Sequence, residues 1–167
     1  MEGRARERAE EEEAGREELL AVLGAITETR LNRPTGREGW TLRHALGAVA
    51  AADRVLSHVL ASLAAEPGTT ARFRLRRLRG EVMYRAHMLQ RDALGRLLRE
   101  THAEAESALA AHAALLRRAI EVEDGPSRSV GDLLALRAER ERAALRALRE
   151  ALPPDRGPRA PGGGRDA

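Results

Sequence analysis

The sequence contains neither cysteine nor lysine in its 167 residues. Without cysteine, the chain cannot form disulfides, thiolate metal sites or a cysteine nucleophile. Without lysine, it has no side chain for Schiff-base chemistry or for the phosphate-binding lysine of a P-loop. All 29 basic residues are therefore arginines. Any binding of anions by lysine or arginine side chains must consequently use guanidinium groups.

Aromatic residues are also scarce: they make up 2% of the chain and comprise Trp40, Phe73 and Tyr84. The hydrophobic share is nevertheless 43%, so leucine, alanine and valine must form the core of a single domain. Few segments alternate polar and apolar residues, and β-branched residues are scattered. This composition predicts an all-α protein.

The sequence shows no signal peptide and no apolar run of the length needed to span a membrane. The net charge of +3 is modest, and the basic residues are spread along the chain rather than gathered on one helix. We therefore expect a cytoplasmic protein with no membrane partner and no nucleic-acid partner.

Four segments have the apolar periodicity of amphipathic helices. They span residues 10–31, 41–64, 92–120 and 129–152, and the third pattern extends more weakly back to residue 81. Proline and glycine separate these segments, and residues 66–80 are predicted to be a connection. Four helices of this length predict a four-helix bundle.

The two ends of the chain differ from this central part. Residues 1–14 are mostly arginine and glutamate, which predicts a charged, solvated helical extension. Residues 15–152 are predicted to form the bundle. Residues 153–167 are rich in proline and glycine and are predicted to be a disordered tail.

The starts of the second and fourth helices carry the clearest local signals. Trp40-Thr41-Leu42-Arg43 indicates an aromatic packing anchor followed by a threonine N-cap. Residues 129–134, Ser-Val-Gly-Asp-Leu-Leu, place an aspartate three positions after a serine, as in a capping box.

These two motifs, in this order and separation, resemble the DinB-like superfamily, which includes mycothiol- and bacillithiol-linked transferases and the N-terminal domain of maleylpyruvate isomerase. The resemblance covers roughly residues 15–152 and implies a four-helix bundle. It also implies a divalent metal held by three histidines within the bundle, with an open position for water or a thiol.

The resemblance places the three ligand positions at Ala48, eight residues after Trp40, and at Arg140 and Ala144 on the fourth helix. None of these is a metal ligand, and an arginine stays protonated. The fourth helix contains no histidine at all. We therefore predict a non-catalytic bundle without a cofactor, which binds a small molecule or a partner protein, with a second copy of the chain as one option.

An alternative interpretation keeps a divalent metal and an activity as a thiol transferase or hydrolase with atypical ligands. His44 shares a helical face with Ala48, and Glu139 and Glu141 lie on the fourth helix. The residues expected to be polar groups at the mouth of a cavity are His44, Asp53 and Glu139.

Arg140 has three possible roles at the degenerate metal site. It can form an ion pair with Asp53 or Glu139, bind an anionic ligand, or extend to solvent with its stem along the bundle. We favour the last of these.

Residues 72–79 form the densest basic cluster, with five arginines and Phe73. Such a cluster can bind phosphate groups or RNA. We interpret it instead as a solvated connection in an arginine-rich protein.

Overall fold

The computed structural model describes the backbone of residues 2–68 and 72–152, and the side chains of these ranges from residue 14 onward. Five α-helices account for most of the described chain, with two 3-10 helices and three short strands between them. The elements are α1 (Glu2–Ala25), η1 (Glu28–Asn32), α2 (Leu42–Ala65), β1 (Arg72–Phe73), α3 (Leu75–Met88), α4 (Arg91–His112), η2 (Ala113–Arg117), β2 (Ala119–Val122), β3 (Arg128–Ser129) and α5 (Val130–Ala151).

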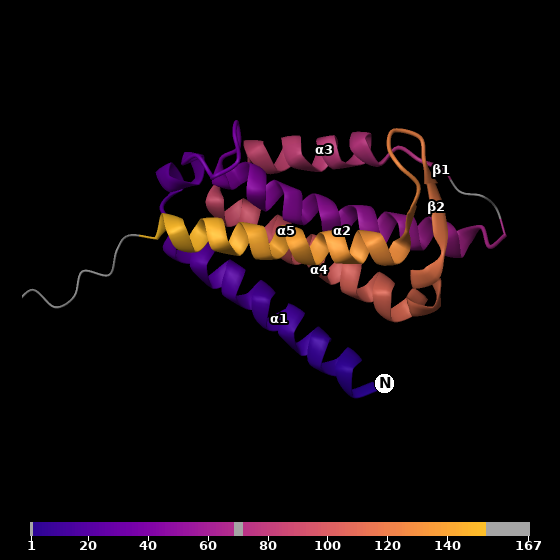
Figure 1. Cartoon of the computed structure of the whole chain (residues 1–167). Coiled ribbons are helices and arrows are strands. Elements are labelled where there is room, and N and C mark those ends of the chain that lie inside the picture. Colours follow the sequence, from indigo (N-terminus) through magenta and orange to yellow (C-terminus); the bar gives the residue numbers. More distant parts are fainter. Residues whose placement is uncertain (1, 69–71, 153–167) are drawn as a thin grey trace, which may run out of the picture.

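Helix α2 is the central element and packs against α3, α4 and α5. Helix α1 packs against α5 and α4, so α1 and α3 lie on opposite sides of the bundle (Figure 1). The short strands form a small sheet at one end, in the order β1-β2-β3, with β1 parallel and β3 antiparallel to β2. Helices α1, α2, α4 and α5 thus make the bundle, and α3 is added to its surface against α2.

The mostly all-α fold and the starts of α2 and α5 agree with the sequence prediction. Thr41 precedes α2, and its N–H donates to Nδ1 of His44 at 3.1 Å. Ser129 and Asp132 form the expected capping box: Ser129 N–H donates to the carboxylate at 2.7 Å, and Asp132 N–H donates to the hydroxyl at 3.1 Å.

Four predicted features of the element boundaries are wrong. The first helix ends at Ala25 rather than near residue 31, and the predicted connection at 66–80 contains β1 and the first turns of α3. The predicted third helix is divided into α3 and α4 at Leu89–Gln90 and ends at His112 rather than near residue 120. A tertiary contact accounts for the new start of α4: the Glu28 carboxylate accepts a hydrogen bond at 2.8 Å from the N–H of Arg91.

The small sheet was not predicted, and it forms because its strands cover one end of the core. Phe73 on β1 and Ile120 on β2 are both buried, in the same apolar cluster as Leu60 of α2 and Val130 of α5. Two apolar side chains in strands this short give no detectable period in the sequence. The predicted tail at 153–167 lies outside the described residues.

Helix α2 is apolar for most of its length, with a mean hydropathy of 1.3 over its most apolar window. By length and composition alone it is able to cross a membrane, but 56% of that window is buried inside the bundle. Burial of this kind is what the core helix of a helical bundle requires.

Gly47 allows α3 to approach α2 closely. A Cβ atom at this position would lie 3.2 Å from Cβ of Ala86 and 3.5 Å from Cα of Met83, both on α3. The absence of a side chain therefore brings α3 against α2 and positions the residues that α3 contributes to the pocket described below.

A carboxylate lies in the middle of the bundle. Asp53 on α2 is completely buried, and Arg16 on α1 and Arg137 on α5 form ion pairs with its two oxygens at 3.0 and 2.7 Å. Thr101 on α4 donates its hydroxyl to the same carboxylate at 3.2 Å. One side chain thus receives contacts from every other helix of the four-helix bundle.

Glu141 completes this cluster, which we call the buried charge network: Arg16, Asp53, Thr101, Arg137 and Glu141. The Glu141 carboxylate accepts from Nε of Arg16 at 2.9 Å, so two cations and two carboxylates balance one another. Buried charges are tolerated when they are paired and hydrogen-bonded in this way.

His102 on α4 lies at the edge of the network, where its Nδ1 is 2.7 Å from Nη2 of Arg137. A guanidinium group can only donate, so Nδ1 of His102 must be unprotonated in this contact. Burial lowers the pKa of His102, and the cations Arg16 and Arg137 lower it further against the opposing effect of Asp53 and Glu106. His102 is thus half-buried rather than a free surface histidine.

We predict that Asp53→Asn destabilises the protein by about 3–5 kcal/mol, because it leaves Arg16 and Arg137 buried without a compensating charge. Urea unfolding followed by circular dichroism measures this loss. The exposed Arg142→Gln on α5 changes the net charge by the same magnitude and is expected to have almost no effect. A loss of less than about 1 kcal/mol in Asp53→Asn would contradict the central role of this carboxylate.

We also predict that acid weakens the fold through His102. The pKa of His102 is lowered in the folded state. As the pH falls below about 6.5, His102 therefore becomes protonated in the unfolded chain before it does so in the folded chain. Stability contributed by neutral His102 is therefore present above that pH and lost as the pH falls. Thermal unfolding at about pH 7 and about pH 5 should show a smaller fall in Tm for His102→Gln than for the wild type. Equal falls would exclude this role.

Candidate functional site

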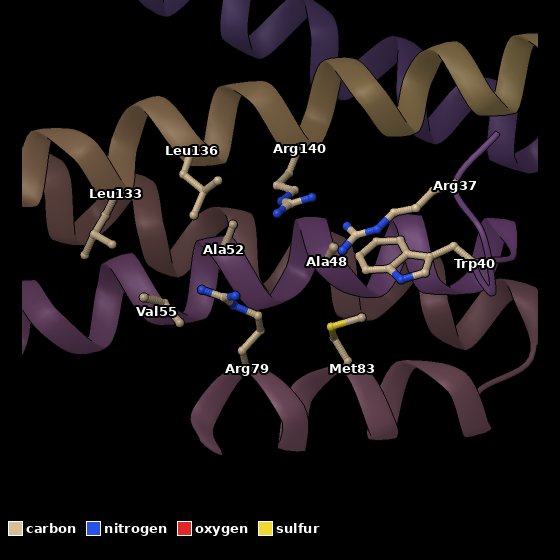
Figure 2. Close-up of a pocket in the computed structure, with 10 residues that line it drawn as sticks. All are labelled: Arg37, Trp40, Ala48, Ala52, Val55, Arg79, Met83, Leu133, Leu136 and Arg140. Atoms are coloured by element: carbon tan, nitrogen blue, oxygen red, sulfur yellow. The ribbon is translucent and has the colours of Figure 1, made fainter. Parts of the chain in front are cut away.

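A pocket lies between α2, α3 and α5, beside the loop that precedes α2 (Figure 2). It has two adjoining parts. The inner pocket has a volume of about 80 Å³, and the outer pocket has a volume of about 280 Å³. Arg37, Trp40, Ala48 and Arg140 line both parts, so the two volumes meet at these four residues.

Each element contributes a different kind of side chain to the inner pocket. Apolar residues of α2 and α5 form its walls, Arg79 and Met83 enter from α3, and Trp40 closes one end. The wall residues are Ala48, Ala52, Val55, Leu133 and Leu136. The pocket therefore combines an apolar wall with a small number of charged groups, the usual composition of a ligand site.

The three positions inferred from the DinB-like resemblance come together in this structure. Ala48 on α2 and Arg140 and Ala144 on α5 all line the outer pocket. The residues at 140 and 144 are one helical turn apart, so both point from the same face of α5 toward Ala48. Trp40 is half-buried at the start of α2, where an anchoring residue was expected, and its indole faces the pocket.

The expected polar residues at the cavity mouth have different positions. Asp53 lies in the buried charge network and contacts neither pocket, and Glu139 is exposed on α5 outside both. His44 is half-buried, with its ring centroid 6.1 Å from that of Trp40 and 5.2 Å from that of His87. These three residues therefore do not form a group around the pocket.

Arg140 does not pair with Asp53 or Glu139. Asp53 pairs instead with Arg137, three residues earlier on α5, which faces the core. The Arg140 guanidinium lies 5.9 Å from the centroid of the Trp40 ring, and in Figure 2 it points into the pocket rather than away from the bundle. Of the three roles considered for Arg140, the position in the pocket is consistent with an anion-binding role.

The inner pocket is strongly cationic. Its charged lining residues are Arg37, Arg79 and Arg140, and no carboxylate lines it. Among the described side chains, at residues 14–68 and 72–152, none of these three guanidinium groups has an ion pair with a carboxylate. The Arg37 guanidinium lies 3.7 Å from the centroid of Trp40, a cation–π contact that holds it at the pocket entrance.

The electrostatic environment of Arg79 reflects this crowding. Burial lowers the pKa of Arg79 first, and repulsion from Arg140 and Arg128 lowers it further, with partial compensation from Asp124. The sequence placed Arg79 in the basic cluster at 72–79 and gave no sign that it faces a pocket.

Other arginines of that cluster have a different environment. Arg72 pairs with Glu121 at 2.9 Å and Arg74 pairs with Glu123 at 2.6 Å, across the small sheet. Because carboxylates of β2 and the following residue neutralise these side chains, the cluster is not a continuous cationic surface. This pairing removes the main sequence argument for contact with nucleic acid at residues 72–74.

The side chains of the pocket do not fit a divalent metal. Ala48 and Ala144 have no side-chain atoms that coordinate a metal, and the guanidinium group of Arg140 has only hydrogen-bond donors and no lone pair for one. Of the two carboxylates considered on α5, Glu141 is engaged with Arg16 and Glu139 is exposed. Across the described parts of the chain, no group of three or more histidine, aspartate or glutamate side chains is placed to hold a metal ion.

The fold and the pocket define a helical-bundle protein with the DinB-like fold. Two solved structures share this architecture: mycothiol-dependent maleylpyruvate isomerase, with a TM-score of 0.64 and 17% sequence identity, and a histidine-to-alanine mutant of that enzyme, with a TM-score of 0.66 and 19% identity. Each comparison covers 81% of this chain and 57% of the other.

The chain therefore spans little more than half the length of these structural relatives, and at this level of identity the likeness is one of fold. No protein-family model matches the sequence, and no curated protein matches it significantly. The predicted DinB-like fold is confirmed by the structural comparison, which leaves the activity of the chain to be inferred from its pocket.

We predict that Arg140→Ala lowers the free energy of unfolding by no more than about 1 kcal/mol, because no carboxylate is left unpaired when the guanidinium is removed. The matched variant Arg137→Ala, one turn away but in the buried charge network, should lose about 3–5 kcal/mol. Urea unfolding of both variants measures the difference. Similar losses would show that Arg140 also has a structural role.

Proposed function

We propose that this chain is a non-catalytic, small-molecule-binding protein built on the DinB-like fold, in which the divalent-metal site has been lost. The observation that supports this proposal is the position of Ala48, Arg140 and Ala144, which surround one pocket yet provide no metal ligand. The space remains, whereas the groups that would hold a metal there are absent. A pocket without a metal can still bind a small molecule, and this is the function that we propose for it.

The names of the structural relatives describe an isomerization that depends on mycothiol. We do not extend this activity to the present chain. In metal-dependent thiol chemistry a bound cation makes the thiol a better nucleophile, and the pocket has no residue that supplies this effect. The hydroxyl group that lines the pocket belongs to Thr35 and donates to the carbonyl oxygen of Trp40 at 3.2 Å, so it is not paired with a base.

A single tryptophan makes the proposal convenient to test. Trp40 lines both parts of the pocket and is the only tryptophan in the chain, so its fluorescence reports directly on occupancy. A ligand that binds the folded state also raises Tm by mass action.

We predict that a small-molecule screen finds compounds that both raise Tm and change Trp40 fluorescence. The variant Ala48→Phe should abolish both effects, because the larger side chain fills the space where the two parts of the pocket meet. Ala135→Phe, at an exposed position of α5, is the matched control and should leave binding unchanged. Compounds that bind equally well to Ala48→Phe would place the binding site elsewhere.

The lost metal site has its own test, based on elemental analysis of the purified protein. The wild type is expected to hold far less than one equivalent of zinc, nickel or manganese. The triple variant Ala48→His, Arg140→His, Ala144→His should bind one equivalent of Zn²⁺, because three imidazoles then face one cavity. Stoichiometric metal in the wild type would overturn the proposal, and a triple variant that folds without binding Zn²⁺ would show that the three positions do not converge closely enough.

A further inference from the structure

The two half-buried arginines of the inner pocket lack the ion pairs that the fully buried arginines of the protein form. Arg16, Arg43 and Arg137 are buried, and each forms an ion pair with at least one carboxylate. Arg79 and Arg140 are half-buried but have no carboxylate partner within ion-pair distance in the described parts of the chain. Charges partly withdrawn from water are stabilised by a counter-charge, and here the partial compensation of Arg79 comes from the longer-range effect of Asp124, so an anion in the pocket would be favourable for both groups.

The two side chains also come from different helices toward the same space. Arg79 enters from α3 and Arg140 enters from α5, and Figure 2 shows both guanidinium groups directed into the pocket between α2 and these helices. Their mutual repulsion is one of the causes that lower the pKa of Arg79. An anion between them would relieve this repulsion and accept charge-assisted hydrogen bonds from both.

The apolar wall of the inner pocket indicates what the non-anionic part of a ligand would contact. Figure 2 shows Val55, Leu133 and Leu136 on one side of the two arginines, with Trp40 and Arg37 on the other. The side chains of Val55 and Leu133 are almost completely buried, so this wall offers apolar surface and no hydrogen-bonding group. An apolar body of a few carbon atoms suits this wall, in contact with the anion site.

We propose that the pocket binds a small organic oxyanion, a carboxylate or a phosphate monoester, whose anionic group lies between Arg79 and Arg140 and whose apolar body packs on Val55, Leu133 and Leu136. This inference rests on the proposed function and adds the chemical class of the ligand. Arg37, held over Trp40, adds positive potential at the entrance and draws anions toward the pocket.

The test uses probes that differ only in their polar group. Cyclohexanecarboxylate, cyclohexyl phosphate and the neutral cyclohexanecarboxamide carry the same apolar ring, and inorganic phosphate carries no ring at all. Binding of each probe to the full chain is measured by isothermal titration calorimetry and by Trp40 fluorescence. We expect one of the two cyclohexyl anions to bind at least about tenfold more tightly than the amide, because charge-assisted hydrogen bonds are roughly twice as strong as neutral ones.

Substitutions then locate the anion. Arg79→Gln and Arg140→Gln should each weaken binding of the preferred anion by about tenfold and leave binding of the amide unchanged. Arg142→Gln, at an exposed position of α5, removes the same charge outside the pocket and should have no effect on either probe. Circular dichroism and Tm confirm that each variant is folded.

The possible results separate this inference from the proposed function. If the amide binds as tightly as both anions and Ala48→Phe still abolishes binding, the pocket is a ligand site but the anionic class is wrong. If inorganic phosphate binds as tightly as cyclohexyl phosphate, the apolar part of the inference is wrong. If no probe binds and the broader screen also finds no ligand sensitive to Ala48→Phe, the proposed function fails as well. If the wild type binds one of the two cyclohexyl anions more tightly and Arg140→Gln loses this preference, the preferred probe shows whether the natural ligand carries a carboxylate or a phosphate group.

Discussion

The carboxylate of Asp53 is the group on which the arrangement of the bundle depends. A lone carboxylate without solvent contact would be strongly unfavourable, so its presence requires that cations be delivered to it. Arg16 and Arg137 bring those cations from α1 and α5, and the Thr101 hydroxyl reaches the same carboxylate from α4. These directional contacts are all satisfied only when each of the helices keeps its present rotation about its own axis.

The same constraint separates the structural and binding faces of α5. Arg137 and Glu141 lie one turn apart and face the buried charge network, whereas Arg140, three residues after Arg137, lines the pocket. Rotation of α5 would exchange these faces and remove the compensation of Asp53. Arg79 and Arg140 repel each other in the pocket, but α5, which carries Arg140, is held in place by the attraction between Arg137 and Asp53.

Local signals in the sequence were sufficient for the helix starts but not for the tertiary contacts. The threonine and serine before α2 and α5 act on adjacent residues, so their effect is visible in the chain. The end of α4 and the small sheet depend on residues far apart in sequence, such as Phe73 and Ile120, which share a cluster only in the folded state. Such contacts leave no periodic pattern.

Some features of the interior were visible in the sequence in another form. Asp53 follows Leu46 and Val49 by seven and four residues, which places a carboxylate on the apolar face of its helix. Its partners could not be chosen from sequence alone among 29 arginines. The convergence of Ala48, Arg140 and Ala144 was implied by resemblance, whereas the contribution of Arg79 depends on the first turns of α3, which were predicted as part of the connection at 66–80.

The contacts of Arg16 have a consequence for how α1 is held in the molecule. Its guanidinium bonds to Asp53 on α2, Glu141 on α5 and the carbonyl of Leu98 on α4, so its binding site consists of three other helices. This site does not exist until those helices have come together. The position of α1, the first helix of the chain, is therefore held by partners that only the folded arrangement of α2, α4 and α5 brings together.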